Sequence, residues 1–351
     1  MAEHTFDLVV LGAGSGGYAA ALRASQLGMS VGLIEKDKVG GTCLHVGCIP
    51  TKALLHAAEV ADSARHSEMF GVKATLEGVD LPAVNTYRDG IVASKHKGLQ
   101  GLIKARGITT IEGTGKLISP TTIAVDEDTV VGKNVILATG SYPRSLPGLD
   151  IGGRIITSEQ ALALDWIPSK VIVLWGGVIG VEFASVWRSF GAEVTIVEGL
   201  PRLVPAEDES ISKQFERAYR KRGINFHTGV RFQSATQDDT SVTVTLEDGT
   251  TETADLLLVA VGRGPKTDGM GFEEVGVTMD RGFVLTDERL RTNIPGVFAV
   301  GDIVPGIQLA HRGFQHGIFV AEELAGMNPM VVSDRNIPKV TYSEPEVASV
   351  G

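Results

Sequence analysis

Apolar and polar positions in the first 35 residues form blocks that predict a strand, a tight turn, a helix and a second strand. Residues 6–11 are a short apolar run of the kind found in buried parallel strands. Residues 12–17, Gly-Ala-Gly-Ser-Gly-Gly, then predict a turn that opens a helix, and Gly28 is expected to end that helix. Residues 30–34 are the next strand, and Glu35 lies at its tip.

The same succession of blocks recurs later in the chain. Residues 171–174 predict a strand, residues 175–180 occupy the turn, and residues 181–190 predict a helix. A second strand follows at residues 193–197. Glu198 lies at its tip, 23 residues after the start of the turn, which is the spacing found in the first unit.

The downstream parts of the two units match as well. Residues 135–141 and 257–263 are each an apolar strand that ends at a glycine. Each follows a predicted hairpin, at residues 122–131 in the first unit and at residues 242–254 in the second. Two such units in one chain predict two bound dinucleotides and the passage of electrons between them.

The glycine turns are suited to dinucleotide binding, because they let a pyrophosphate approach the backbone and rest at the N-terminus of the following helix. Glu35 and Glu198 are placed to accept hydrogen bonds from a ribose. An acid at this position favours a free ribose hydroxyl, so Glu198 predicts NAD rather than NADP in the second unit. Trp175 replaces the first glycine of the second turn, and its side chain either swings away or crowds the pyrophosphate.

The two cysteines of the chain, Cys43 and Cys48, lie five residues apart. A disulfide across so small a loop would be a poor structural staple. In a regular helix the two Cα atoms would be about 7.5 Å apart along the axis, more than the roughly 4.4–6.8 Å of a bridged pair. Gly47 allows the chain to leave helical geometry, so we interpret the pair as a bond that is made and broken. The alternative is two buried thiols that never pair.

Composition narrows the class of protein. A chain of 351 residues with 43% hydrophobic residues is long enough for two or three domains. Its formal net charge of −10 argues against a nucleic-acid partner, which requires a basic surface. The N-terminus lacks the features of a signal peptide, and no apolar run approaches the length of a membrane span. We therefore expect a cytoplasmic protein without membrane contact, in which an adjacent cysteine pair indicates redox chemistry. We expect no metal site.

Four segments together resemble the flavin-dependent pyridine nucleotide-disulfide oxidoreductases, and most closely the dihydrolipoamide dehydrogenases. They are residues 40–52 (GGTCLHVGCIPTK), residues 138–140 (ATG), residues 178–182 (VIGVE), and residues 300–302 (VGD) with 309–311 (LAH). The resemblance implies FAD in the first unit, at Gly12, Gly14, Gly17, Glu35, Thr42, Lys52, Gly115, Thr139, Gly140, Asp302 and Ala310. It implies NAD in the second unit, at Gly177, Gly180, Glu198 and Gly262.

The resemblance also implies the catalytic groups, Cys43, Cys48, Lys52 and Glu182. Cys48 would face the flavin, and Cys43 would be the exposed sulfur that exchanges with substrate. Cys48 also lies near the start of a predicted helix, whose positive end lowers the pKa of a thiol. Lys52 lies one turn further on the same face, and Glu182 would pair with it. We interpret His45, His311 and His316 as polar-loop, packing or flavin-contact residues rather than as acids or bases.

The expected fold is α/β, with two Rossmann-like dinucleotide-binding domains of three-layer ββα architecture, the second inserted into the first. Residues 1–148 begin the FAD-binding domain, residues 149–269 form the NAD-binding domain, and residues 270–338 return to complete the first. Residues 339–351 resemble the first strand of a truncated α+β interface domain. Such a strand would have no sheet to join, so we expect exposed apolar surface around Val347 and Val350.

The implied reaction is oxidation of dihydrolipoamide by the Cys43–Cys48 disulfide, with electrons passing through FAD to NAD⁺. The partner would be the lipoyl-bearing acyltransferase of a 2-oxo acid dehydrogenase complex, and the full-length family forms homodimers. The resemblance places the base in the interface domain, so we expect faster electron transfer from NADH to artificial acceptors than dithiol oxidation. Alternatives are an NADH diaphorase or quinone reductase, and a non-catalytic complex subunit. Glu198 disfavours glutathione reductase, and the absence of further cysteines disfavours mercuric reductase.

Overall fold

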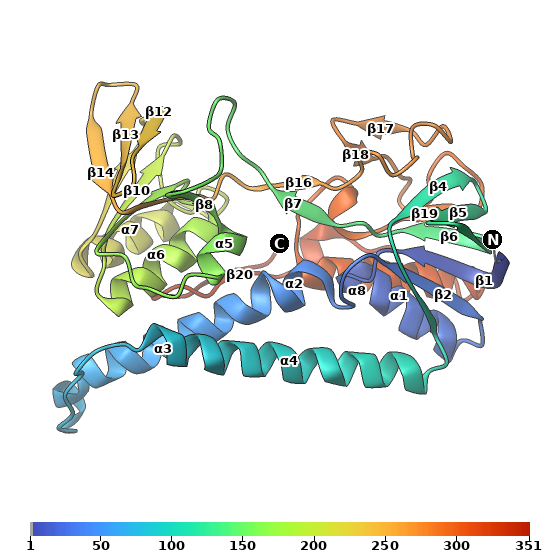
Figure 1. Ribbon diagram of the computed structural model, residues 1–351, viewed down its shortest axis with the longest axis horizontal. Coiled ribbons are helices and arrows are strands. Elements are labelled where there is room, and N and C mark those ends of the chain that lie inside the picture. The colour runs from blue at the N-terminus through green and yellow to red at the C-terminus, as the bar shows by residue number, and fades with distance from the viewer. Residues whose placement is uncertain (1–2) are drawn as a thin grey trace.

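The first sheet combines N-terminal strands with one strand from late in the chain (Figure 1). The structure, a computed structural model, describes residues 3–351. The strand order is β3-β2-β1-β6-β5-β4, and β19 pairs in parallel with the second half of β6. The strands are β1 (Glu3–Leu11), β2 (Val31–Glu35), β3 (Thr109–Glu112), β4 (Gly115–Ser119), β5 (Thr122–Val125), β6 (Asp128–Leu137) and β19 (Val297–Ala299). The segment after residue 270 therefore returns to the first sheet.

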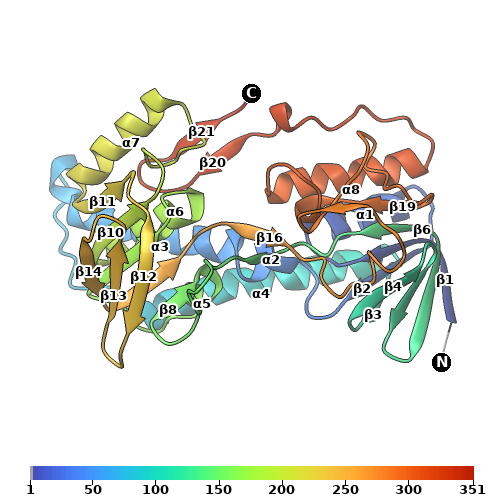
Figure 2. The same cartoon turned by 90° about the horizontal axis from the view of Figure 1, so that it is seen from above.

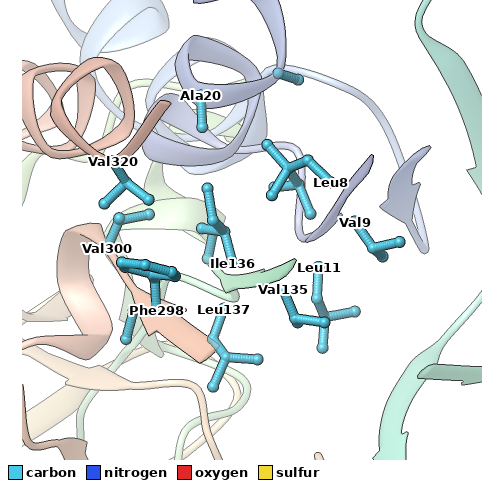
Figure 3. Packing of buried hydrophobic residues seen from close by; sticks show 14 of the residues in the cluster. Leu8, Val9, Leu11, Ala20, Val135, Ile136, Leu137, Phe298, Val300 and Val320 are labelled. Atoms are coloured by element: carbon cyan, nitrogen blue, oxygen red, sulfur yellow. The ribbon is translucent and has the colours of Figure 1, made fainter. Parts of the chain in front are cut away.

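Helices α1 (Ser15–Gln26) and α8 (Ala310–Leu324) pack against each other and against this sheet. Central strand residues such as Leu8 and Ile136 are fully buried, and Ala20 of α1 and Val320 of α8 join them in one core (Figure 3). Residues 8–11 of β1 and 135–137 of β6 are all buried, because the parallel part of the sheet is covered on both faces.

The second unit has three layers. Its parallel sheet has the order β11-β10-β9-β15-β8, and helix side chains cover one face while a small antiparallel sheet, β12-β13-β14, covers the other. Alternate residues of β9 show the division, since Val173 contacts the helix cluster and Ile172 contacts the small-sheet cluster. The elements are β8 (Ile155–Thr157), α5 (Ser158–Leu162), β9 (Lys170–Leu174), α6 (Val178–Phe190), β10 (Glu193–Glu198), α7 (Glu209–Lys221), β11 (Ile224–Thr228), β12 (Phe232–Gln237), β13 (Val242–Leu246), β14 (Thr251–Ala254) and β15 (Leu256–Val259).

Two antiparallel strands connect the units. The apolar run predicted as one strand at residues 135–141 is divided, because β6 ends at Leu137 and the chain re-enters a strand as β7 (Ser141–Pro143). The run at residues 257–263 divides in the same way into β15 and β16 (Arg263–Pro265). β7 and β16 pair with each other and cross between the two lobes (Figure 1).

A helical arm runs along both units (Figure 1). It consists of α2 (Gly41–His45), α3 (Cys48–Arg65), η1 (Ser67–Phe70) and α4 (Leu81–Ala105). α3 packs against α4 and also against α6 of the second unit. The cysteine segment at the start of this arm is therefore held between the two dinucleotide-binding units.

The C-terminal segment differs from the expectation. Residues 339–351 form a hairpin of β20 (Lys339–Thr341) and β21 (Val347–Ser349), which lies beside α7 (Figure 2). The expectation of an unpaired strand with exposed Val347 was wrong, because the hairpin satisfies its own backbone and leaves Val347 only 8% exposed. Val350 is 67% exposed, as expected. The remaining elements are β17 (Met279–Asp280), β18 (Phe283–Val284), η2 (Gly301–Ile303) and η3 (Asp334–Asn336).

Candidate functional site

The two cysteines lie on either side of a break between two helices. α2 ends at His45 and α3 begins at Cys48, so the pair does not share one continuous helix. Gly47 makes the break with φ −144° and ψ −112°, and a Cβ there would lie 2.9 Å from the Thr42 carbonyl oxygen. Thr51 donates its hydroxyl to the Gly47 carbonyl at 2.7 Å and fixes the first turn of α3. The break brings the two sulfurs together.

Both cysteines are free thiols, and they interact with each other. The hydrogen bond between the two thiols lowers the pKa of Cys48. The same hydrogen bond, together with burial, raises the pKa of Cys43. Cys48 is therefore the sulfur with the lower pKa. Both residues are half-buried.

An ion pair crosses from the cysteine helix to the second unit. The Lys52 ammonium on α3 lies 3.0 and 3.1 Å from the two carboxylate oxygens of Glu182 on α6. The Glu182 side chain is 5% exposed and that of Lys52 is 34% exposed. Lys52 also lies one turn from Cys48, and its charge further lowers the pKa of that thiol. The sequence-based pairing of Lys52 with Glu182 is therefore present in the structure.

These groups line one cleft between the units. The lining contains most of the residues that the sequence assigned to catalysis or to the flavin: Gly14, Thr42, Cys43, Cys48, Lys52, Gly140, Glu182 and Asp302. Val178, Ile179 and Phe183 of α6 contribute the apolar side chains of the second unit. A cleft with a thiol pair, an ion pair and apolar walls can hold a planar cofactor against sulfur.

The first glycine turn has the form of a pyrophosphate cradle. Gly12 has φ +100°, a left-handed conformation, and a Cβ on Gly17 would lie 1.8 Å from the Gly12 carbonyl oxygen. The N-terminal turn of α1 has no side-chain cap, so its N–H groups are free to face an anion. One Glu35 oxygen accepts from the Ala13 N–H at 2.8 Å, and the carboxylate is only half-buried. These residues fit the dinucleotide that the sequence predicts.

The second turn repeats this geometry with tryptophan in place of glycine. The Trp175 N–H donates to the Val197 carbonyl at 2.8 Å, as the Gly12 N–H does to Ile34. A Cβ on Gly180 would lie 2.0 Å from the Trp175 carbonyl oxygen. Trp175 has φ +81°, so it keeps the backbone of the turn in a conformation that is strained for a residue with a Cβ.

Glu198 is more enclosed than its counterpart Glu35. It is completely buried, and its two carboxylate oxygens accept from the Gly176 N–H at 2.9 Å and the Leu200 N–H at 2.7 Å. Glu35 makes the corresponding pair of bonds, to the Ala13 N–H at 2.8 Å and the Asp37 N–H at 3.1 Å. The ribose contact of Glu198 stays a prediction. Leu203 covers Gly176, where a Cβ would lie 2.3 Å from its side chain.

The other residues that the sequence assigned to the cofactors differ in their position and in their hydrogen-bond partners. The Asp302 carboxylate in η2 accepts from the Ser141 hydroxyl at 2.6 Å, and Ala310 begins α8. The Thr139 hydroxyl donates to the Lys266 carbonyl at 2.5 Å. Gly177 precedes α6, and Gly262 has φ +95° beside the β7–β16 connection. Gly115 lies away from the cleft lining, because it packs against Leu11 and Ile34 in the core.

The histidines have structural partners. His45 lies 3.0 Å from the Val39 carbonyl and His311 lies 2.6 Å from the Pro338 carbonyl. His316 is buried and accepts from the Gly301 N–H at 3.3 Å, and burial lowers its pKa to about 4. It is therefore neutral near pH 7, which agrees with a packing role.

Sequence reasoning missed three residues beside the cleft: Ser141, Arg263 and Tyr342. Arg263 donates its Nε to the Ser141 hydroxyl at 2.8 Å, and the Tyr342 N–H donates to Glu182 at 2.8 Å. Ser141 and Arg263 each follow a glycine that ends an apolar strand, which was the available signal. Tyr342 had no local signal, because its partners lie more than 150 residues away in sequence.

The described residues, 3–351, contain neither a candidate metal site nor a helix that could cross a membrane. No group of three or more His, Cys, Asp or Glu side chains there could hold a metal ion. Within the same residues, no helix is both long and apolar enough to cross a membrane.

Comparisons with known proteins show which family this chain resembles. The family model described as pyridine nucleotide-disulphide oxidoreductase matches residues 6–317. The chain is 39% identical to a dihydrolipoyl dehydrogenase of Bacillus subtilis, over 99% of this chain and 77% of that protein. It is 43% identical to the mitochondrial dihydrolipoyl dehydrogenase of Pisum sativum, over 98% and 72% of the two chains. The crystal structure of LpdA from Mycobacterium tuberculosis superposes with a TM-score of 0.92 at 28% identity, over 99% of this chain and 78% of that one.

Proposed function

This chain belongs to the pyridine nucleotide-disulphide oxidoreductase family, and we propose that it oxidises a dihydrolipoyl dithiol with NAD⁺ as the final electron acceptor. The observation that carries the proposal is the thiol pair at a helix break, in one cleft with the Lys52–Glu182 ion pair. The curated relatives at 39–43% identity are named for the same activity. The cofactors of this enzyme are FAD and NAD(H).

FAD would occupy the part of the cleft that the first unit lines. The glycine turn and the α1 N-terminus would hold its pyrophosphate, and Glu35 and Asp302 would accept from its hydroxyl groups. FAD, when bound, supplies the two-electron link between the thiol pair and NAD⁺. Val178 and Ile179 extend the cleft into the second unit, where NAD would bind.

The thiol pair would take electrons from the substrate by disulfide exchange. Starting from the Cys43–Cys48 disulfide, a substrate thiolate attacks Cys43, a mixed disulfide forms and the Cys48 thiolate leaves. The second thiol of the substrate loses its proton and attacks the substrate sulfur of the mixed disulfide. The substrate thereby closes as a disulfide. Cys43 leaves as a thiolate and takes up a proton. The result is a Cys43 thiol beside a Cys48 thiolate, which agrees with the raised pKa of Cys43 and the lowered pKa of Cys48.

The Lys52–Glu182 pair would set the charge beside Cys48. A cation near a thiolate stabilises it, and a low-pKa thiol is also the better leaving group in exchange. Glu182 fixes the ammonium from the second unit through two hydrogen bonds. The pair thereby ties the position of the thiol helix to the domain that would bind NAD.

We extend the proposal to partners. A dihydrolipoyl dithiol in a 2-oxo acid dehydrogenase complex is carried by the acyltransferase, so a lipoyl-bearing acyltransferase is the proposed partner. A homodimer is the proposed assembly. Support for both comes from the names of the relatives and the family resemblance rather than from a contact in this chain.

The test is NADH formation from dihydrolipoamide and NAD⁺ by the FAD-loaded chain, followed by absorbance. Cys43→Ser and Cys48→Ser should each abolish this activity while retaining bound FAD and electron transfer from NADH to a dye, which needs no thiol exchange. Dithiol oxidation that survives both substitutions would contradict the proposal. Dye reduction by the unmodified chain without any dihydrolipoamide oxidation would favour the diaphorase alternative.

A further inference from the structure

The C-terminal hairpin reaches the ion pair of the cleft. The backbone N–H of Tyr342 donates to a Glu182 carboxylate oxygen at 2.8 Å. The aromatic ring of the same residue lies under the Lys52 ammonium, with 4.7 Å between Nζ and the ring centroid. One residue therefore contacts both members of the pair, the acid through its backbone and the base through its ring.

The position of Tyr342 is set by contacts of its neighbours. The Glu344 N–H donates to the Ser185 hydroxyl of α6 at 3.0 Å, and its carbonyl accepts from Arg222 at 2.8 Å. Arg222 in turn pairs with Asp62 of α3 at 2.9 Å. These bonds hold the hairpin to both helices that carry the ion pair, and they do not involve the Tyr342 ring.

We propose that Tyr342 is a positioning residue, whose ring holds the Lys52 ammonium in one arrangement between Glu182 and Cys48. A lysine with a 34% exposed side chain has several rotamers available, and holding it in one of them costs conformational entropy. A cation over an aromatic face is attracted by the ring quadrupole, which offsets part of that cost. The inference rests on the proposed function only in giving Lys52 and Cys48 their role.

The expected consequence is a change in the pKa of the Cys48 thiol. The charged groups that act on Cys48 are Lys52, which lowers its pKa, and Glu182, which raises it, beside the hydrogen bond from Cys43. If the ring no longer restrains the ammonium, Lys52 spends less time near Cys48 and the pKa of the thiol rises. The strength of an exposed cation–π contact corresponds to a rise of roughly 0.4 to 0.7 unit.

The experiment uses the small number of thiols in the chain. Cys43→Ser leaves Cys48 as the sole thiol in 351 residues, so the rate of its alkylation by iodoacetamide against pH reports one pKa. In this background, Tyr342→Leu should move the midpoint of the profile upward by roughly 0.4 to 0.7 unit. Tyr342→Phe, which keeps the ring face, should leave it in place. The assay requires neither NAD nor a dithiol substrate, so its outcome is independent of the test of function.

Control variants test whether a shift in the Cys48 midpoint comes from the loss of the Tyr342 ring. Tyr87→Leu removes an equally exposed tyrosine from α4, 45% against 43% exposed, and should leave the midpoint unchanged. If Tyr342→Leu does not fold, Tyr342→Gln serves as the second ring-free variant. An unchanged or lowered midpoint in the folded ring-free variant would overturn the proposal. An equal shift in Tyr342→Phe would also overturn it, because the hydroxyl rather than the ring would then be responsible.

Discussion

A hydrogen bond between the two thiols separates their pKa values. It is the largest influence on both groups, and it lowers the pKa of Cys48 and raises that of Cys43. The sequence predicted the low pKa of Cys48 from its place near a helix N-terminus, but the sequence could not show the hydrogen bond. That bond exists because Val46 and Gly47 interrupt the helix and bring the sulfurs together.

The first prediction separates this hydrogen bond from the helix effect. Cys43→Ala removes the donor, so the pKa of Cys48 should rise by about one to two units toward the ordinary thiol value. Cys43→Ser keeps a hydroxyl donor and should give a smaller rise. Because thiolate reacts and thiol does not, Cys48 alkylation near pH 7 should be slower in the alanine variant. Coincident pH profiles for the two variants would show that the helix N-terminus and Lys52 dominate instead.

The second prediction concerns Trp175, which occupies the glycine position of the second turn at φ +81°. Trp175→Gly should tighten NADH binding several-fold, because glycine relieves the left-handed strain and lets a pyrophosphate approach the backbone. Trp175→Ala removes the indole but keeps a Cβ. Fluorescence titration with NADH should therefore rank glycine tightest, and equal dissociation constants for all three forms would show that the tryptophan is tolerated.

At the scale of elements, the sequence predicted the two repeated units because each local block matches its structure. The hairpin expected at residues 242–254 is β13 and β14, and the helix expected at residues 181–190 lies within α6. The division of residues 135–141 into β6 and β7 was not predicted, since an apolar run does not reveal that its last residues pair with another unit. The C-terminal hairpin was missed for the related reason that its support comes from α6 and from Arg222, which directly follows α7.

The packing of α1 on α8 depends on backbone contacts that only glycine allows. A Cβ on Gly317 of α8 would lie 2.2 Å from the Gly16 carbonyl oxygen of α1. Gly317→Ala should therefore force the helices apart and lower the free energy of unfolding by about 1–3 kcal/mol. The measurement is urea unfolding of the purified protein, with the change read from the midpoint at constant slope.

Gly101 supplies the matched control for this substitution. It lies in α4, and a Cβ there would meet nothing within 4 Å. Gly101→Ala should raise the free energy of unfolding by about 0.5–1 kcal/mol, because alanine has the higher helix propensity and no contact is lost. Equal effects at both glycines would mean that propensity alone decides the outcome and that the α1–α8 contact can relax.

At the scale of the whole molecule, a polar chain links the flavin site to the second unit. The Ser141 hydroxyl on β7 donates to Asp302, and it accepts from Arg263 on β16 at 2.8 Å. Arg263 also lies 3.4 Å from Glu159 at the start of α5. The connection between the lobes is therefore also the support of Asp302, the acid that would accept from the FAD side chain.

The last prediction tests whether the polar chain from Asp302 through Ser141 to Arg263 acts as one unit. Ser141→Ala and Arg263→Met should each weaken FAD binding about tenfold, since each loosens the support of the half-buried Asp302 carboxylate. Both act through the Ser141 hydroxyl, so the double variant should bind FAD no worse than the weaker single variant. Arg154→Met, which loses bonds only to carbonyl groups of the second unit, should leave FAD affinity unchanged. Flavin titration of the apoprotein measures all four variants. Additive losses would show that Arg263 and Ser141 support the site independently, and that the link between the lobes does not reach the cofactor through Asp302.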